Sequence, residues 1–369
     1  MQIVGHIFAG LLVAAAAYGA TVPSVDSARG QHIFSDQSCI QCHSINGEGA
    51  KIAPDLGKRI DRSYTPALLT SIMWNHAPTM WAAMEARGIE RPALDEQAAA
   101  DLFAYFYSAR FFDKLGDAGR GKQAFSTNHC ASCHAIADLK PGAPKPVAQW
   151  ESLGSPIELA EAMWNHAANM REEFAKKRLR WPELTSQELA DILVYVRNLR
   201  ETRHVAAHLE TAGAAGGEAL FQSKGCPGCH TGKLELRPRL RGKTLTDIAV
   251  DMWNHAPKMA QPPPKLERDD MRRIVSYLWA EQLLTQSGNV AHGKQVFAAK
   301  NCAACHNDPS SGAPSLTGRK AAFSSVSMVA TLWRHGPQML ERMKEKRIAW
   351  PRFTANQMSD LIAYLDAGQ

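Results

Sequence analysis

Cys39-Ile40-Gln41-Cys42-His43 is the segment that decides how this sequence is interpreted. Its pattern, Cys-x-x-Cys-His, occurs four times in 369 residues and uses all eight cysteines. The copies are Cys39-Cys42-His43, Cys130-Cys133-His134, Cys226-Cys229-His230 and Cys302-Cys305-His306. In this motif both thiols form thioethers with the vinyl groups of a haem, and the histidine becomes the proximal iron ligand. The sequence therefore predicts four covalently bound haem c groups.

Two other uses of paired cysteines fit less well. A single Cys-x-x-Cys occurs in redox disulfides and forms half of many zinc sites. Zinc gives no reason for a histidine directly after every second cysteine, whereas haem attachment requires it each time. Four identical copies therefore favour haem over zinc or a disulfide.

The charge of the chain does not indicate a nucleic-acid partner. The formal net charge is +6, but each haem adds two propionates. Taking a ferric porphyrin as about +1 and its propionates as −2, four haems bring the net charge to roughly +2 when oxidised and about −2 when reduced. Hydrophobic residues make up 45% of the chain, which allows several modest cores around the haems.

The similarity among the four copies extends beyond the motif. A glycine lies nine residues, and a phenylalanine five residues, before each first cysteine: Gly30 and Phe34, Gly121 and Phe125, Gly217 and Phe221, Gly293 and Phe297. Each repeat closes with an amphipathic helix that carries an aliphatic residue and a tyrosine: Leu102 and Tyr105, Ile192 and Tyr195, Ile274 and Tyr277, Leu361 and Tyr364. We expect the first and last helices of a repeat to cross, because glycine lets another helix approach closely. Thr185 with Glu188, and Thr354 with Gln357, predict capping boxes at two closing helices.

This arrangement resembles the class I cytochrome c fold. The resemblance implies an all-α protein of four tandem cytochrome c domains, at residues 27–113, 114–204, 211–285 and 287–369, each a small helical bundle around one haem. It also implies that the carbonyl of a proline after each motif accepts a hydrogen bond from the proximal histidine and so orients the imidazole. Pro54, Pro238 and Pro314 match that position. Repeat two reads Pro144-Lys145-Pro146-Val147, so the proline that would serve His134 stays open.

Every repeat offers two candidates for the sixth iron ligand. A Trp-x-His segment is followed four residues later by methionine, and the spacing puts both side chains on one face of a helix. The methionines Met80, Met170, Met259 and Met339 are favoured, because their distances from the motifs resemble those of distal methionines in class I cytochromes c and because a thioether suits ferrous iron. The competing candidates are His76, His166, His255 and His335.

The first 20 residues are predicted to direct export. They are apolar from Ile3 to Ala20, interrupted by His6, and end in small residues. A basic N-terminal part is missing, so an uncleaved membrane anchor is the alternative, since about 18 apolar residues just reach the span of a bilayer. The resemblance implies haem attachment outside the cytoplasm. We therefore expect the protein in the periplasm or on the outer face of the membrane.

Two strong-field ligands on each iron leave no open position for a substrate. We therefore expect a carrier of single electrons, without catalytic residues and without a small-molecule substrate or nucleic-acid partner. Its expected partners are a redox protein that donates electrons and one that accepts them, with a membrane oxidoreductase complex as an alternative.

Two rival functions stay open. An enzyme would need one iron without a sixth ligand, and repeat four is the candidate because Leu332, Arg334 and Gly336 replace the Met, Asn and Ala of the other repeats. A structural role, as a cytochrome subunit of a membrane complex or as a unit of an extracellular conduit, would show as stable copurification or self-assembly.

Overall fold

The computed structural model of the chain is almost entirely helical where it is described. It describes residues 24–57, 65–108, 116–138, 142–205, 213–240, 243–284, 288–316 and 322–368. Within these residues, the strands are β1 (Ser44–Ile45) and β2 (Glu48–Gly49), which form one short antiparallel pair. The predicted all-α class is confirmed. Residues 1–20 and the predicted boundaries near residues 113, 210 and 286 lie outside the described residues.

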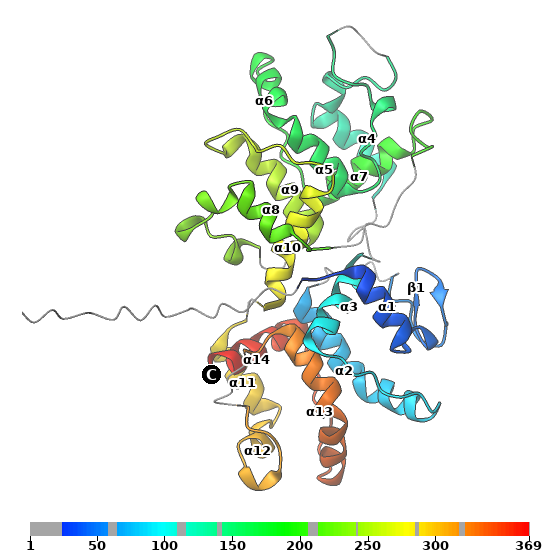
Figure 1. Cartoon of the computed structure of the whole chain (residues 1–369), viewed down its shortest axis with the longest axis vertical. Coiled ribbons are helices and arrows are strands. Elements are labelled where there is room, and N and C mark those ends of the chain that lie inside the picture. Colours follow the sequence, from blue (N-terminus) through cyan, green and yellow to red (C-terminus); the bar gives the residue numbers. More distant parts are fainter. Residues whose placement is uncertain are drawn as a thin grey trace, which may run out of the picture.

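Each repeat has an opening helix, a middle helical segment and a closing helix (Figure 1). The opening helices are α1 (Ser27–Asp36), α4 (Ala118–Thr127), α8 (Gly217–Ser223) and α11 (Val290–Ala299). The middle segments are α2 (Pro66–Glu85), α5 (Pro156–Asn165) with α6 (Ala167–Lys176), α9 (Leu245–His255) and α13 (Ser325–Glu345). The closing helices are α3 (Glu96–Ser108), α7 (Ser186–Arg197), α10 (Asp270–Leu284) and α14 (Ala355–Ala367). No helix in the described ranges is both long and apolar enough to cross a bilayer.

Side-chain caps explain where several of these helices begin. The predicted capping boxes of α7 and α14 are confirmed: Thr185 pairs with Glu188, and Thr354 pairs with Gln357. Each box satisfies backbone N–H groups that have no partner within the helix. Short 3-10 turns lie in the connections, namely η3 (Val147–Gln149), η5 (Gly232–Leu234), η6 (Arg237–Arg239), η7 (Ala256–Lys258) and η8 (Pro309–Ser311).

The opening and closing helices of each repeat cross at the predicted glycine. A Cβ atom added to Gly30 would lie 2.1 Å from the backbone oxygen of Asp101 and 2.7 Å from the Cβ of Tyr105. At the other three glycines the same carbonyl contact would be between 1.9 and 2.2 Å, far inside van der Waals distance. The phenylalanine one turn later packs on the tyrosine of the closing helix, with ring centroids 5.4 to 5.9 Å apart in the four repeats. This predicted crossing is therefore confirmed in every repeat.

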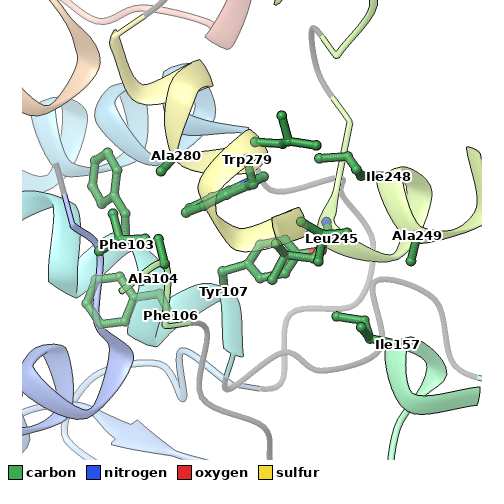
Figure 2. Close-up of a cluster of buried hydrophobic side chains, with 14 of the residues drawn as sticks. Phe103, Ala104, Phe106, Tyr107, Ile157, Leu245, Ile248, Ala249, Trp279 and Ala280 are labelled. Carbon is green, nitrogen blue, oxygen red and sulfur yellow. The ribbon is translucent and has the colours of Figure 1, made fainter. Parts of the chain in front are cut away.

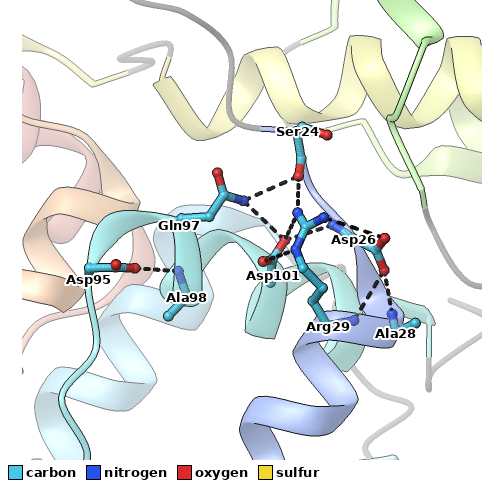
Figure 3. Close-up of polar contacts among 8 residues, drawn as sticks. All are labelled: Ser24, Asp26, Ala28, Arg29, Asp95, Gln97, Ala98 and Asp101. Carbon is cyan, nitrogen blue, oxygen red and sulfur yellow. Dashed lines mark hydrogen bonds and ion pairs between the residues drawn. The ribbon is translucent and has the colours of Figure 1, made fainter.

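A buried aspartate joins the two crossing helices in repeats one and two. Asp101 accepts hydrogen bonds from the Asp26 amide at 2.7 Å and from Arg29 Nε at 2.9 Å (Figure 3). Asp191 accepts the corresponding bonds from the Asp117 amide at 2.7 Å and from Arg120 Nε at 2.8 Å. The arginine lies directly before the crossing glycine, and the aspartate lies four residues before the tyrosine. The sequence patterns did not predict this recurring pair.

The four repeats form two lobes: repeats two and three, which are neighbours in the sequence, form one, and repeats one and four, at its two ends, form the other. Helix α5 packs on α9, so repeats two and three share one lobe, drawn in green and yellow in Figure 1. Helix α2 packs on α13 and α14, so repeats one and four share the other lobe. The lobes meet where α10 contacts α13 and where Tyr107 of α3 packs on Trp279 of α10, with ring centroids 5.2 Å apart. The Tyr107 hydroxyl also accepts a hydrogen bond from the Leu245 amide at the start of α9 (Figure 2).

We expect Gly121→Ala to destabilise repeat two by about 3 kcal/mol, because the new methyl group meets a backbone carbonyl that cannot rotate away. Gly119→Ala in the same helix is the control, since its added Cβ would meet only the Asp117 carboxylate, at 3.2 Å. Urea unfolding of both variants checks this. Equal unfolding midpoints would contradict the helix crossing.

Asp191→Asn is expected to lower stability at pH 7 by roughly 2 kcal/mol, since it removes charge-assisted hydrogen bonds. Burial raises the pKa of Asp191, but the hydrogen bonds from Arg120, the Asp117 amide and Gln187 outweigh it, so this pKa lies below its usual range. The carboxylate therefore stabilises the fold above its unfolded pKa of about 3.9, and this contribution disappears as the pH falls through the lower folded pKa.

Urea unfolding between pH 7 and pH 3 measures this dependence. The difference in the free energy of unfolding between the wild-type protein and Asp191→Asn should become smaller below about pH 4. Glu173→Gln is the control, because its ion pair with Lys176 lies on the surface, where solvent screens it, and should contribute little to stability. If this difference in the free energy of unfolding stays constant between pH 7 and pH 3, the proposed contribution of the Asp191 carboxylate is excluded.

Candidate haem sites

The four Cys-x-x-Cys-His motifs adopt the same tight turn. They lie in η1 (Cys39–Gln41), η2 (Cys130–Ser132), η4 (Cys226–Gly228) and α12 (Ala303–His306) with the residues around them. The residue before each first cysteine has a positive φ, 56° to 78°, which ends the opening helix. The amide of each histidine then donates to the carbonyl of the first cysteine, at 2.9 to 3.1 Å. One helical turn therefore presents two thiols and an imidazole together.

The cysteines are available for thioether bonds. All eight lie in the described residues and are free thiols. Burial raises the pKa of Cys39, Cys130 and Cys302 to about 11. These first cysteines therefore lie in apolar surroundings, where a porphyrin edge would also be placed.

Backbone carbonyls orient the motif histidines. His43 Nδ1 lies 2.9 Å from the Pro54 oxygen, and His306 Nδ1 lies 2.9 Å from the Pro314 oxygen, as predicted. In repeat two the acceptor is Lys145, at 3.3 Å, so neither flanking proline serves His134.

The prediction for Pro238 in repeat three is wrong. His230 Nδ1 lies 3.2 Å from the Leu234 oxygen, because η5 returns the chain to the ring only four residues after the histidine. In all four repeats Nδ1 therefore faces a carbonyl, which makes Nδ1 the protonated nitrogen and leaves the lone pair of Nε2 for a metal.

These donors fit a haem better than a bare metal ion. Among the described residues, no group of three or more His, Cys, Asp or Glu side chains is placed to hold a metal. Structural zinc needs four protein ligands, whereas haem iron takes four nitrogens from the porphyrin and only its axial ligands from the protein. A turn with two thiols and one oriented imidazole matches the second requirement.

The segments that carry the candidate sixth ligands differ between the lobes. In repeats one and four, histidine and methionine lie on one uninterrupted helix, α2 or α13, as the spacing predicts. In repeat two the helix breaks at His166, between α5 and α6. In repeat three α9 ends at His255, and Met259 is extended after η7.

The two sets of candidate ligands also differ in burial. The methionine is half-buried in all four repeats, and Met80, Met170 and Met259 pack against the main core. The histidine is exposed in repeats one, three and four.

Repeats two and three also bring two imidazoles close together. The rings of His134 and His166 have centroids 6.3 Å apart, and those of His230 and His255 are 5.7 Å apart. His166 Nδ1 contacts the Ala162 oxygen, so its Nε2 also carries the free lone pair. Burial lowers the pKa of His166, which favours the neutral form that binds iron.

The departures of repeat four have a packing explanation. A Cβ added to Gly336 would lie 2.4 Å from the Trp81 ring, so glycine allows α13 to approach α2 closely. Leu332 is buried in the main core. The glycine therefore serves the contact with repeat one, and Leu332 contributes to the core.

Tryptophan and asparagine of the Trp-x-His segments bind the other repeat of the same lobe. Trp253 Nε1 donates to the Pro182 oxygen at 2.9 Å, and the Asn254 side chain exchanges two hydrogen bonds with the backbone of Leu184, at 2.8 and 2.9 Å. Trp164 and Asn165 make the same bonds to Pro264 and Leu266, and Trp74 and Asn75 make them to Pro351 and Phe353. This role was not predicted from the sequence, although a Pro-x-Leu or Pro-x-Phe precedes each partner's closing helix.

Comparison with known families agrees with this geometry. Residues 27–109 and 118–200 each match the sequence profile of the family described as cytochrome c. Residues 288–365 match the profile described as cytochrome c oxidase, cbb3-type, subunit III. No characterised protein and no solved structure is similar enough in sequence to match the chain. The chain, with its all-helical repeats and its haem-attachment motifs, is a multi-domain c-type cytochrome.

Proposed function

We propose that the protein carries single electrons through four covalently attached haem c groups, one in each repeat. The observation that carries this proposal is the fourfold recurrence of the attachment turn, each time with the histidine Nδ1 facing a carbonyl. Repeat three is matched by neither family profile, yet it has the same turn, the same glycine crossing and the same Phe–Tyr contact. A haem in repeat three is therefore supported by its own geometry.

The chain's own residues hold and orient the group. The thiols of each motif bind the porphyrin edge, and the carbonyl facing Nδ1 fixes the imidazole plane and strengthens its donation. The bound iron supplies a reversible one-electron change of valence, and the protein sets its potential through the ligands and burial.

Methionine is the sixth ligand in this proposal, at Met80, Met170, Met259 and Met339. Its support is that a half-buried methionine follows the Trp-x-His segment in all four repeats, whereas three of the four histidines are exposed. A second candidate arises in repeats two and three, where the ring centroids of two imidazoles lie only 6.3 and 5.7 Å apart. Two axial ligands on each iron would exclude substrates and favour electron transfer over catalysis.

The partners in this proposal are redox proteins. The match of residues 288–365 to a cbb3-type oxidase subunit favours a membrane oxidase complex as one partner. Cytochrome c domains of this kind work outside the cytoplasm, which agrees with an export signal or anchor in residues 1–20. The domain limits at 27–113, 114–204, 211–285 and 287–369 follow from assigning one haem to each repeat.

Intact mass measured under denaturing conditions tests the haem count. We expect the purified protein to carry the mass of four haem groups, because thioether bonds survive unfolding. Cys226→Ala with Cys229→Ala should remove one group and leave three, since repeat three attaches its own haem. Retention of four groups in this double variant would refute attachment at repeat three.

Optical spectra of the oxidised protein test the sixth ligand. We expect the far-red charge-transfer band of methionine bound to ferric haem at the intensity of four such haems, and Met80→Leu should remove a quarter of it. A band of half that intensity, unchanged in Met170→Leu and Met259→Leu, would assign His166 and His255 instead. A high-spin haem that binds added cyanide in the wild-type protein would indicate an iron without a sixth protein ligand, and hence an enzyme.

A further inference from the structure

The contacts between repeats two and three are reciprocal. Trp164 and Asn165 of repeat two bind the segment before α10, and Trp253 and Asn254 of repeat three bind the segment before α7. Each of these tryptophans lies two residues before a candidate ligand, His166 or His255. The same hydrogen bonds that join the repeats therefore also position the two segments that carry the candidate iron ligands.

Between the described residues of repeats one and four, only the Trp-x-His segment of repeat one makes these hydrogen bonds. Trp74 and Asn75 bind the segment before α14, but repeat four has Arg334 where the others have asparagine. The indole nitrogen of Trp333 is buried and has no hydrogen-bond partner among the described residues. Hydrogen bonding therefore does not explain why a tryptophan stands at this position.

Aromatic rings connect the candidate ligand segments within the first lobe. Trp74 stacks on Trp350 with centroids 5.1 Å apart, Trp350 meets Trp81 at 5.8 Å, and Trp81 meets Trp333 at 6.0 Å. Trp74 and Trp81 flank the His76–Met80 segment of repeat one, and Trp333 lies two residues before His335 of repeat four. We call these four residues the tryptophan bridge; it runs from one ligand segment to the other.

The second lobe has a comparable connection. Trp253 of repeat three stacks on Trp181 of repeat two, with centroids 4.3 Å apart. Trp181 meets Phe174 at 5.9 Å, and Phe174 meets His129 at 6.4 Å, directly before the attachment cysteine Cys130. Helix α6, which contains Met170, also contacts η7, which directly precedes Met259.

We infer that electrons exchange within two pairs of repeats, one with four and two with three, across the aromatic contacts between them, and not in the order of the sequence. This inference rests on the proposed function. Each exchange moves one electron, so that one iron is oxidised and its partner is reduced. The tryptophan side chains are neither oxidised nor reduced, and no bond forms or breaks. Closely packed rings shorten the distances through empty space that the electron must cross.

The contact between lobes is of a different kind. It joins repeat three to repeat one, where Tyr107 of α3 meets Trp279 of α10 and Leu245 at the start of α9, and to repeat four, where α10 contacts α13. None of the residues labelled in Figure 2 is a candidate iron ligand. Exchange between the lobes should therefore be slower than exchange within a lobe.

Removal of single haems from the full chain tests the pairing. Cys302→Ala with Cys305→Ala removes the haem of repeat four, and Cys226→Ala with Cys229→Ala removes that of repeat three. Electron paramagnetic resonance then measures which remaining ferric haem loses its dipolar relaxation enhancement. We expect the first variant to affect the haem of repeat one, and the second to affect the haem of repeat two. If removal of the haem of repeat four mainly reduces the relaxation enhancement of the haem of repeat three, the pairing is overturned.

Two single substitutions test the aromatic contacts, and each is the control for the other. Trp350→Leu should slow electron exchange between repeats one and four at least tenfold after partial photoreduction, and leave exchange between repeats two and three unchanged. Trp181→Leu should do the reverse. Trp350→Phe keeps a ring and should recover most of the rate. Equal rates in all variants, with four haems and unchanged helix content, would overturn the role of the tryptophans.

The two proposals fail in different ways. Fewer than four haems in the wild-type protein would refute the proposed function. Four haems whose dipolar interactions follow the sequence order would refute only the pairing.

Discussion

The close crossing of the opening and closing helices is the contact on which the rest of each repeat depends. At Gly30 and its three counterparts the helix backbones approach so closely that even a methyl group would overlap a carbonyl oxygen. This contact fixes where the opening helix ends, and the attachment turn begins at that point with a residue of positive φ. It also fixes the closing helix, and hence the Pro-x-Leu or Pro-x-Phe segment before α7, α10 and α14. Both the haem-binding turn and the surface for the neighbouring repeat are therefore positioned by one crossing.

The Trp-x-His segments perform two tasks that are coupled by their position. In repeats one, two and three their tryptophan and asparagine bind another repeat. In all four repeats the histidine and methionine that follow are the candidate iron ligands. A shift at the interface between repeats would therefore move the ligands as well. This coupling explains how a chain of small domains, each with little core of its own, can hold its redox centres at defined separations.

Repeat four shows how packing can imitate a functional signal. Its Leu332 and Gly336 suggested an altered iron site when the repeats were compared as sequences. In the structure, Gly336 accommodates Trp81 of repeat one, and Leu332 fills the core. The glycine follows from a neighbour that is remote in the sequence, and a comparison of repeats alone could not reveal that contact.

The sequence by itself determined the features that depend on short-range spacing. These are the attachment motifs, the Gly and Phe face of each opening helix, and the capping boxes at Thr185 and Thr354, because each involves residues within one turn or one short loop. The carbonyl partners of His43 and His306 followed from the resemblance to class I cytochromes c. The sequence did not reveal Leu234 as the partner of His230, since the path of a loop depends on how η5 folds.

Only the tertiary structure decided which repeats lie together. Nothing in the order of four similar repeats distinguishes a linear array from two crosswise lobes. That choice depends on how Trp74 meets Trp350 and how Asn254 meets Leu184. Such contacts depend on surface shape and on hydrogen bonds between segments up to 278 residues apart, which no local pattern encodes.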